Sequence, residues 1–105
     1  MAAESKIKRL AQDFLNYLEI EKGRAPNTIE NYKFYLKRFF IWAEIKDPGQ
    51  IDQNMVRNFR LWLNRQKDAN GQPLKKNTQN YHLIALRAFL KYLAKRDIKT
   101  LAPEK

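Results

Sequence analysis

The stretch KKNTQNYHLIALRAFLKYLAKR, residues 75–96, combines an apolar stripe with an unbalanced positive charge. Four leucines recur in it at steps of three, four and three residues, a spacing that gathers side chains on one face of an α-helix: Leu83, Leu86, Leu90 and Leu93. The same 22 residues include six basic side chains and no Asp or Glu. We therefore expect a helix that buries leucines on one side and presents positive charge on the other.

The polar face of this helix carries groups that suit a nucleic acid. On a helical wheel its members fall within roughly a quarter turn of one another: Asn77, Asn80, Arg87, Lys91 and Lys95. Asparagine and arginine can read base edges in the major groove, and clustered cations bind phosphates through counterion release. The first turn adds free backbone N–H groups that can bind a phosphate oxygen, at Lys75, Lys76, Asn77 and Thr78. Tyr81 either stacks or hydrogen-bonds at a DNA surface or packs at the helix edge.

Length and composition predict one folded domain that binds an anionic partner. A chain of 105 residues with 44% hydrophobic and 12% aromatic residues supports a packed core rather than disorder. The formal net charge of +10 is concentrated in residues 24–43, 52–67 and 75–96, whereas residues 1–23 are neutral. This bias favours a nucleic acid or an anionic membrane surface as the partner.

Several classes of function lack the residues they need. The chain has no cysteine and a single histidine, which excludes disulfide frameworks, thiolate metal sites and Ser-His-Asp or Cys-His catalysis. We expect no catalytic residue, no metal site and no cofactor, and we interpret His82 as a partly buried structural residue. No apolar run reaches the roughly 18 residues of a membrane span, and no secretory segment is present. We therefore expect a soluble, cytoplasmic protein without a membrane partner.

Three further helices are predicted before residue 75. The first covers residues 6–22 and stops at Gly23, and the third begins after the capping residue Asp52 and runs for about 14 residues. The second begins after Pro26, with Asn27 as N-cap and Glu30 completing a capping box. No stretch is typical of a strand. The expected fold is all-α, a compact four-helix bundle whose long connections favour crossed helix pairs.

The outer face of the second helix mixes charged and apolar side chains. Asn31, Lys37 and Arg38 lie on this face, with Lys33 at its edge. Phe34 and Ile41 stand among them, which is unusual for a solvated face and marks a possible protein contact, or else ordinary surface exposure. Phe14, Tyr32, Phe39 and Trp62 have core spacing instead and are predicted to pack inside.

Two ordered motifs resemble a known family. The first is Asn27-Thr28-x3-Tyr32-x3-Leu36-x2-Phe39, and the second is Asn77-Thr78-x4-Leu83-x2-Leu86-Arg87-x-Phe89-x2-Tyr92-Leu93. In this order, with a short helix between them, they resemble the amino-terminal core-binding (SAM-like) domain of tyrosine recombinases and phage integrases. The resemblance covers nearly the whole chain. It implies a SAM-like core-binding domain in residues 1–100 and the start of an interdomain linker at residues 101–105.

The resemblance also implies a function in DNA integration or recombination. Core-binding domains form one half of a clamp around duplex DNA and present their second and fourth helices to the major groove. A separate carboxy-terminal domain supplies the tyrosine nucleophile, so this chain alone is expected not to be an enzyme, whereas its parent protein would be a DNA recombinase. The implied partners are double-stranded DNA, the catalytic domain of the same parent chain and sister protomers on the DNA.

The resemblance and the helical wheel together define the candidate site. The resemblance matches Thr28 and Asn31 in the second helix, with Lys37 beyond them, and the start of the fourth helix at Lys76, Asn77, Thr78 and Tyr81. Charge and helical geometry add the remaining members. The full predicted DNA-binding set is Thr28, Asn31, Lys33, Lys37, Lys75, Lys76, Asn77, Thr78, Asn80, Tyr81, Arg87 and Lys91.

Two other functions stay open on the residues alone. A helical protein-interaction domain with a basic surface would account for exposed Phe34 and Ile41 and for the neutral first helix. A helix-turn-helix regulator is the other alternative. Against it, the third and fourth helices are separated by about ten residues, whereas that motif uses a turn of three or four.

Overall fold

The computed structural model describes residues 6–98 and Thr100. This part of the chain contains the α-helices α1 (Lys6–Ile20), α2 (Pro26–Ala43), α3 (Gln53–Asn64) and α4 (Lys76–Lys95), and the short 3₁₀ helix η1 (Pro48–Gln50) before α3. The described residues form no strand, and Lys67 and Pro73 make an isolated β-bridge in the loop before α4. The all-α prediction is confirmed. The linker expected at residues 101–105 lies outside the described residues.

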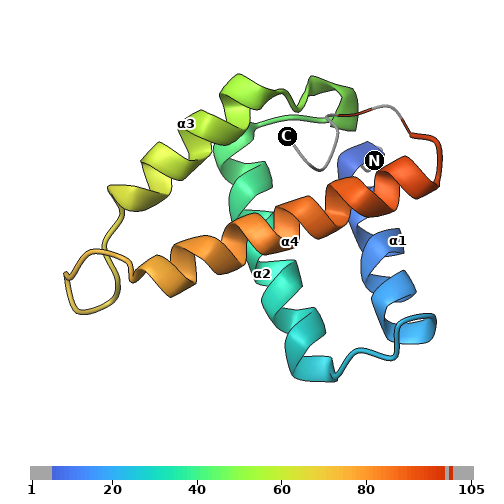
Figure 1. Ribbon diagram of the computed structural model, residues 1–105, viewed down its shortest axis with the longest axis horizontal. Coiled ribbons are helices and arrows are strands. Elements are labelled where there is room, and N and C mark those ends of the chain that lie inside the picture. Colours follow the sequence, from blue (N-terminus) through green and yellow to red (C-terminus); the bar gives the residue numbers. More distant parts are fainter. Residues whose placement is uncertain (1–5, 99, 101–105) are drawn as a thin grey trace, which may run out of the picture.

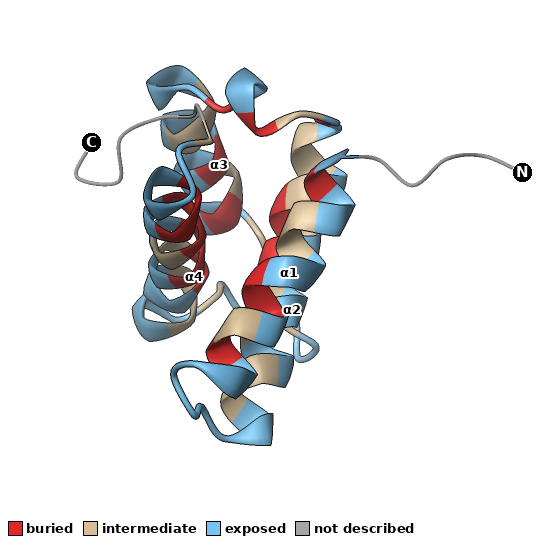
Figure 2. Ribbon diagram, turned by 90° about the vertical axis from the view of Figure 1, so that its right-hand side faces the viewer, coloured by how far each residue is buried: buried red, intermediate tan, exposed pale blue. Residues whose placement is uncertain are grey.

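The helices form two layers that cross each other. α1 and α2 lie side by side in one layer, and α3 and α4 form the other (Figure 2). α4 runs across α2 at a steep angle (Figure 1). The expected crossed helix pairs are therefore confirmed, and the crossing of α2 and α4 lies at the centre of the fold.

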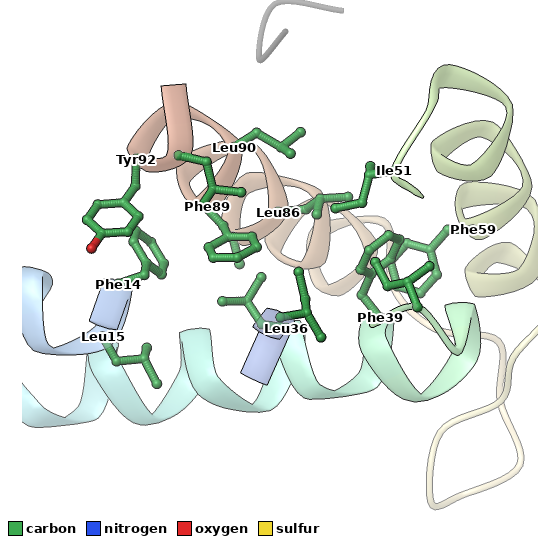
Figure 3. Close-up of a cluster of buried hydrophobic side chains, with 14 of the residues drawn as sticks. Phe14, Leu15, Leu36, Phe39, Ile51, Phe59, Leu86, Phe89, Leu90 and Tyr92 are labelled. Atoms are coloured by element: carbon green, nitrogen blue, oxygen red, sulfur yellow. The ribbon is translucent and has the colours of Figure 1, made fainter. Parts of the chain in front are cut away.

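One phenylalanine from each α-helix contributes to the core between the layers. Phe14, Phe39, Phe59 and Phe89 are each at most 1% exposed. The rings of Phe14 and Phe89 meet at a centroid distance of 5.6 Å, and those of Phe39 and Phe59 meet edge to face at 4.9 Å. Figure 3 shows these side chains pointing toward one another from all the helices, together with Leu36 and Leu86. Such geometries add to the hydrophobic stabilisation from burial.

The buried face of α4 is wider than the predicted leucine stripe. Leu86, Leu90 and Leu93 are buried as expected, while Leu83 is only half-buried. Other buried residues of α4 lie outside the stripe: His82, Ala85, Phe89 and Tyr92. The stripe widens because α1, α2 and α3 all contact α4, so the helix is covered on more than one side.

Two predicted helix signals are confirmed. Asp52 caps α3, since its carboxylate Oδ1 accepts a hydrogen bond from the Met55 amide at 2.8 Å. Gly23 ends the first helical segment with a φ of 60°, and the following Arg24 amide donates to the Leu18 carbonyl at 3.0 Å. α1 and α3 are each about one half-turn shorter than the sequence suggests, which is common because terminal turns fray.

The predicted start of α2 is wrong. Asn27 is not the N-cap and makes no capping box with Glu30; the N-cap is Ala25, which caps through no side chain, and Pro26 is the first helical residue. A proline at this position loses nothing by lacking an N–H, and its fixed φ suits the first turn. The helix therefore begins before Asn27.

Truncation of Phe89 should cost more stability than any change on the outer face of α4. Because Phe89 is fully buried against Phe14 and Phe40, Phe89→Ala is expected to lower the free energy of unfolding by about 3–5 kcal/mol. Ile84→Ala is the matched control on the same helix, since Ile84 is 46% exposed. Its expected cost is below about 1 kcal/mol. Urea unfolding followed by circular dichroism measures both, and equal losses would contradict this description of the core.

Candidate nucleic-acid interface

Part of the residue set predicted from sequence lies where α2 crosses the amino-terminal half of α4. Tyr35 of α2 stacks on Tyr81 of α4 with ring centroids 6.4 Å apart and an interplanar angle of 26°. Tyr35 also contacts the imidazole ring of His82 at 4.5 Å. Tyr81 remains 50% exposed, so part of the residue stays open to a ligand while Tyr35 packs against its ring.

His82 positions the Arg38 guanidinium at this crossing. The residue is 1% exposed, more deeply buried than expected, and its Nδ1 lies 2.7 Å from the Thr78 carbonyl oxygen. A carbonyl oxygen only accepts, so Nδ1 carries the proton and Nε2 of the neutral ring can accept. The Arg38 guanidinium donates to that Nε2 at 3.4 Å, and it also lies over the Phe34 ring at 5.2 Å. The orientation of Arg38 is thus set by one contact from α4 and one from its own helix, α2.

Burial keeps His82 neutral near physiological pH. Desolvation is the main cause that lowers its pKa below the ordinary value of 6.5, while the hydrogen bond to the Thr78 carbonyl acts in the opposite direction. The nearby positive charge of Arg38 lowers the pKa further. A neutral ring can accept from Arg38, whereas a protonated ring would repel it.

Arg38 lies in the candidate site, although the residue set predicted from sequence does not include it. Thr28, Asn31, Tyr35 and Arg38 follow one another at steps of three, four and three residues, so they share the face of α2 that lies toward α4. A helical wheel shows this spacing. It does not show that Tyr35 and Arg38 contact α4, which is what makes Arg38 part of the surface.

The exposed face of α4 continues the surface. Asn77, Asn80, Arg87 and Lys91 are all exposed, and Ile84 stands between them at 46% exposure. Thr78 is half-buried, and its carbonyl is engaged by His82. We call the following residues the crossing surface: Thr28, Asn31, Tyr35 and Arg38 of α2, and Asn77, Asn80, Tyr81, Ile84, Arg87 and Lys91 of α4.

Two predicted lysines lie on the other side of α2. Lys33 and Lys37 line an apolar groove of about 530 Å³ between α2 and α1, together with Leu15, Phe40 and exposed Ile41. The fold therefore does not bring these lysines together with the residues that face α4. Phe34, which sequence reasoning paired with Ile41, packs instead beside Arg38 and His82 at the crossing.

The two helices of the crossing surface begin without side-chain caps. The N-cap residues are Ala25 for α2 and Lys75 for α4, and neither helix end receives a side-chain hydrogen bond. By contrast, α3 and η1 are capped by Asp52 and Asp47. The first amides of α2 and α4 therefore keep their capacity to bind an anion, and the helix dipole favours negative charge there.

Among the described residues, no ion pair neutralises the positive charge of this surface. Residues 75–96 contain no carboxylate. Lys76, exposed at the start of α4, donates to the neutral Asn64 side chain at 3.3 Å, and Lys75 is exposed beside it. The ion pair of Lys6 with Asp47 at 3.6 Å belongs to a different part of the molecule. Such an uncompensated helix face attracts a polyanion.

Comparison with known proteins identifies the family. Residues 11–97 match the family described as phage integrase, N-terminal SAM-like domain. The chain belongs to this family. The matched residues include both α2 and α4, so the crossing of these helices is part of a SAM-like domain. The resemblance inferred from the two sequence motifs is confirmed.

Curated relatives of this SAM-like domain are tyrosine recombinases. Tyrosine recombinase XerC of Leptospira interrogans is 31% identical over 98 residues, which cover 91% of this chain and 30% of the relative. XerC of Psychromonas ingrahamii is 30% identical over 104 residues, covering 96% of the chain and 33% of the relative, and XerC of Haemophilus ducreyi is 29% identical over 103 residues, covering 95% and 32%. The chain thus spans about a third of the length of these relatives. No solved structure matches it significantly.

The described residues contain neither a metal-binding cluster nor a membrane-spanning helix. Residues 6–98 and Thr100 include no group of three or more His, Cys, Asp or Glu side chains that could hold a metal ion. Within the same part of the chain, no helix has the length and apolar character that crossing a membrane requires.

The buried His82 should make stability depend on pH. Because its pKa is lowered in the fold, the unfolded chain binds the proton first, so the stabilisation is complete above pH 6.5 and is lost as the pH falls below that value. The slope should approach, at most, about 1.4 kcal/mol per pH unit. Chemical unfolding between pH 7.5 and 5 measures it.

His82→Asn is the control for this pH dependence. Its amide nitrogen corresponds in position to Nδ1, so it can still donate to the Thr78 carbonyl but does not titrate, while all carboxylates stay as in the wild type. The variant should therefore show a flatter dependence over this range. Equal slopes for the two proteins would show that His82 does not titrate as described.

Proposed function

We propose that this chain is the duplex-DNA-binding module of a tyrosine recombinase and that α2 and α4 face the major groove. The observation that carries the proposal is the crossing surface, where an exposed, carboxylate-free face of α4 adjoins Asn31 and Arg38 of α2. A helix of this diameter fits the major groove, and a polyanion supplies the charge that the fold lacks.

The helix starts are suited to phosphates. The uncapped first turn of α4 presents free amides beside the exposed cations Lys75 and Lys76. The uncapped start of α2 presents free amides beside Thr28 in the same way. Contacts of this kind fix the orientation of a protein on the duplex without reading its sequence.

Neutral side chains further along the surface are suited to bases. Asn77 and Asn80 can pair with an adenine edge, and Ile84 offers an apolar contact for a thymine methyl group. Tyr81 is held on one side by Tyr35, which lowers the entropic cost of presenting its ring. Arg38 is likewise oriented before binding by His82 and Phe34, and it suits a guanine edge or a phosphate.

The proposal assigns this chain the binding role within a recombinase. The XerC relatives are about three times longer than the matched segment, and the matched family is the amino-terminal domain. We infer that cleavage and joining of DNA depend on a separate catalytic domain of the parent protein, with its tyrosine nucleophile. The partners are then duplex DNA, that domain and sister protomers.

Binding to DNA should fall steeply with salt and depend on the start of α4. For Lys76→Gln, loss of one phosphate contact should flatten the slope of log affinity against log salt by about 0.9. The ratio of wild-type to variant affinity should therefore be about eightfold larger at 0.1 M than at 1 M salt. All sequences should be affected alike. Fluorescence anisotropy with a random duplex of 30 base pairs measures the effect.

A change in base-reading residues should behave differently. Asn80→Ala is expected to alter preference among duplexes selected from a random pool by about 1–3 kcal/mol at one base pair, with the salt slope unchanged.

Lys46→Gln is the control for the charge removed in Lys76→Gln, because Lys46 is exposed in the connection between α2 and η1, away from the crossing surface. Wild-type binding that ignores salt, or equal effects of Lys46→Gln and Lys76→Gln, would contradict the proposed interface.

The groove between α1 and α2 supports a second role in protein contact. Ile41 is 66% exposed at a groove of about 530 Å³ whose other lining includes Ile7, Leu15 and Leu36. Since the crossing surface lies on the other side of α2, DNA and a protein could be bound together. We propose that a sister protomer on the same DNA occupies this groove.

Ile41→Asp should therefore weaken cooperative assembly and leave the affinity for one short duplex unchanged. An acidic side chain cannot be buried in an apolar contact without a large desolvation cost. Ile20→Asp is the matched control, because Ile20 is 77% exposed at the end of α1 and does not line the groove. Sedimentation on a long duplex measures the cooperativity, and equal cooperativity for both variants would exclude the groove as a protomer contact.

A further inference from the structure

A second cationic feature lies at the far end of α4 from its first turn. A hollow of about 270 Å³ opens between the carboxy-terminal end of α1, the connection to α2 and the second half of α4. Four exposed cations and three tyrosines line it, with Phe14, Leu18 and Ala88: Lys22, Arg24, Lys91, Lys95, Tyr17, Tyr32 and Tyr92. No carboxylate is among the lining residues.

Two of the ammonium groups converge on Tyr17. Lys95 Nζ donates to the Tyr17 hydroxyl at 3.5 Å, and Lys22 Nζ lies 5.9 Å from the centre of the same ring. None of the four cations forms an ion pair with another described residue. The two ammonium groups beside the Tyr17 ring repel each other, so a bound anion would lower the electrostatic free energy of the fold.

Two acids lie near the hollow but do not line it. Asp13 and Glu21 lie close enough to raise the pKa of Tyr92, although burial is the larger cause and Arg96 acts in the opposite direction. Neither carboxylate lines the hollow. A tyrosine whose pKa is raised keeps its proton, so its hydroxyl remains a hydrogen-bond donor for an anion.

We propose that this hollow binds a backbone phosphate of the duplex that the crossing surface faces. This inference rests on the proposed DNA-binding function. Lys91 lies 14 residues beyond Asn77, which places it about 21 Å further along the helix. The major groove is only about 12 Å wide, so when Asn77 and Asn80 contact bases and α4 crosses the groove, the hollow reaches the sugar–phosphate backbone at the groove edge.

The inference gives the first helical segment a role that its charge does not suggest. Residues 1–23 are neutral in sum, which favours packing or protein contact rather than phosphate binding. The turn at Gly23 nevertheless directs Lys22 and Arg24 to the side of α4 that carries Lys91 and Lys95. The phosphate site is therefore assembled from segments that lie almost 70 residues apart.

The test is a double variant confined to the α1–α2 connection, Lys22→Gln with Arg24→Gln. It removes two charges from the hollow without changing α4 or the crossing surface. Anisotropy with a random duplex of 30 base pairs, at several salt concentrations, should show a slope of log affinity against log salt that is flatter by about 0.9 than for the wild type. The ratio of wild-type to variant affinity should be about eightfold larger at 0.1 M than at 1 M salt. The charge-conserving pair Lys22→Arg with Arg24→Lys should bind as the wild type does.

The control is Arg9→Gln with Lys46→Gln, which removes the same charge from exposed positions outside the hollow. It should change affinity by less than about twofold, since distant surface charges are screened. If the wild type binds the duplex and the Lys22–Arg24 variant binds it no more weakly than this control does, the phosphate site alone is overturned. Failure of the wild type to bind any duplex would overturn both this site and the proposed function.

Discussion

The packing of α2 across α4 is the interaction on which the rest of the molecule depends. Phe39 and Phe89, one from each of these helices, are almost completely buried and are held by phenylalanines from the other two helices. The same crossing buries His82, and His82 in turn orients Arg38 at the surface. The residues that fix the positions of the helices also fix the side chains that the helices present. Core packing and the proposed DNA contact therefore depend on the same residues.

Much of this fold could be predicted from the sequence because it depends on local signals. Apolar periodicity located all the α-helices, and Asp52 and Gly23 marked ends that the structure confirms. The start of α2 was misjudged because Asn27 and Glu30 form a plausible capping box, whereas the fixed φ of Pro26 lets the helix begin earlier. Local signals thus conflict at one helix end, and the backbone constraint of proline decides the outcome.

The candidate site was only partly predictable, for a different reason. A helical wheel sorts the exposed residues of α2 onto one face, yet it does not show which neighbouring helix lies on either side. Lys33 and Lys37 therefore appeared equivalent to Asn31, although they line the groove toward α1. Arg38 and the hollow at Lys22 depend on contacts between segments far apart in sequence, for which no local pattern exists.

The central claim is that DNA is bound at the crossing of α2 and α4. The rival basic surface is the outer face of α3, where Arg57, Arg60 and Arg65 are exposed. Backbone amide NMR of the chain titrated with a duplex of random sequence compares the two directly. We predict that chemical-shift changes concentrate in residues 24–38 and 76–91 and diminish as salt is added. Changes concentrated in residues 53–65 instead would contradict this account.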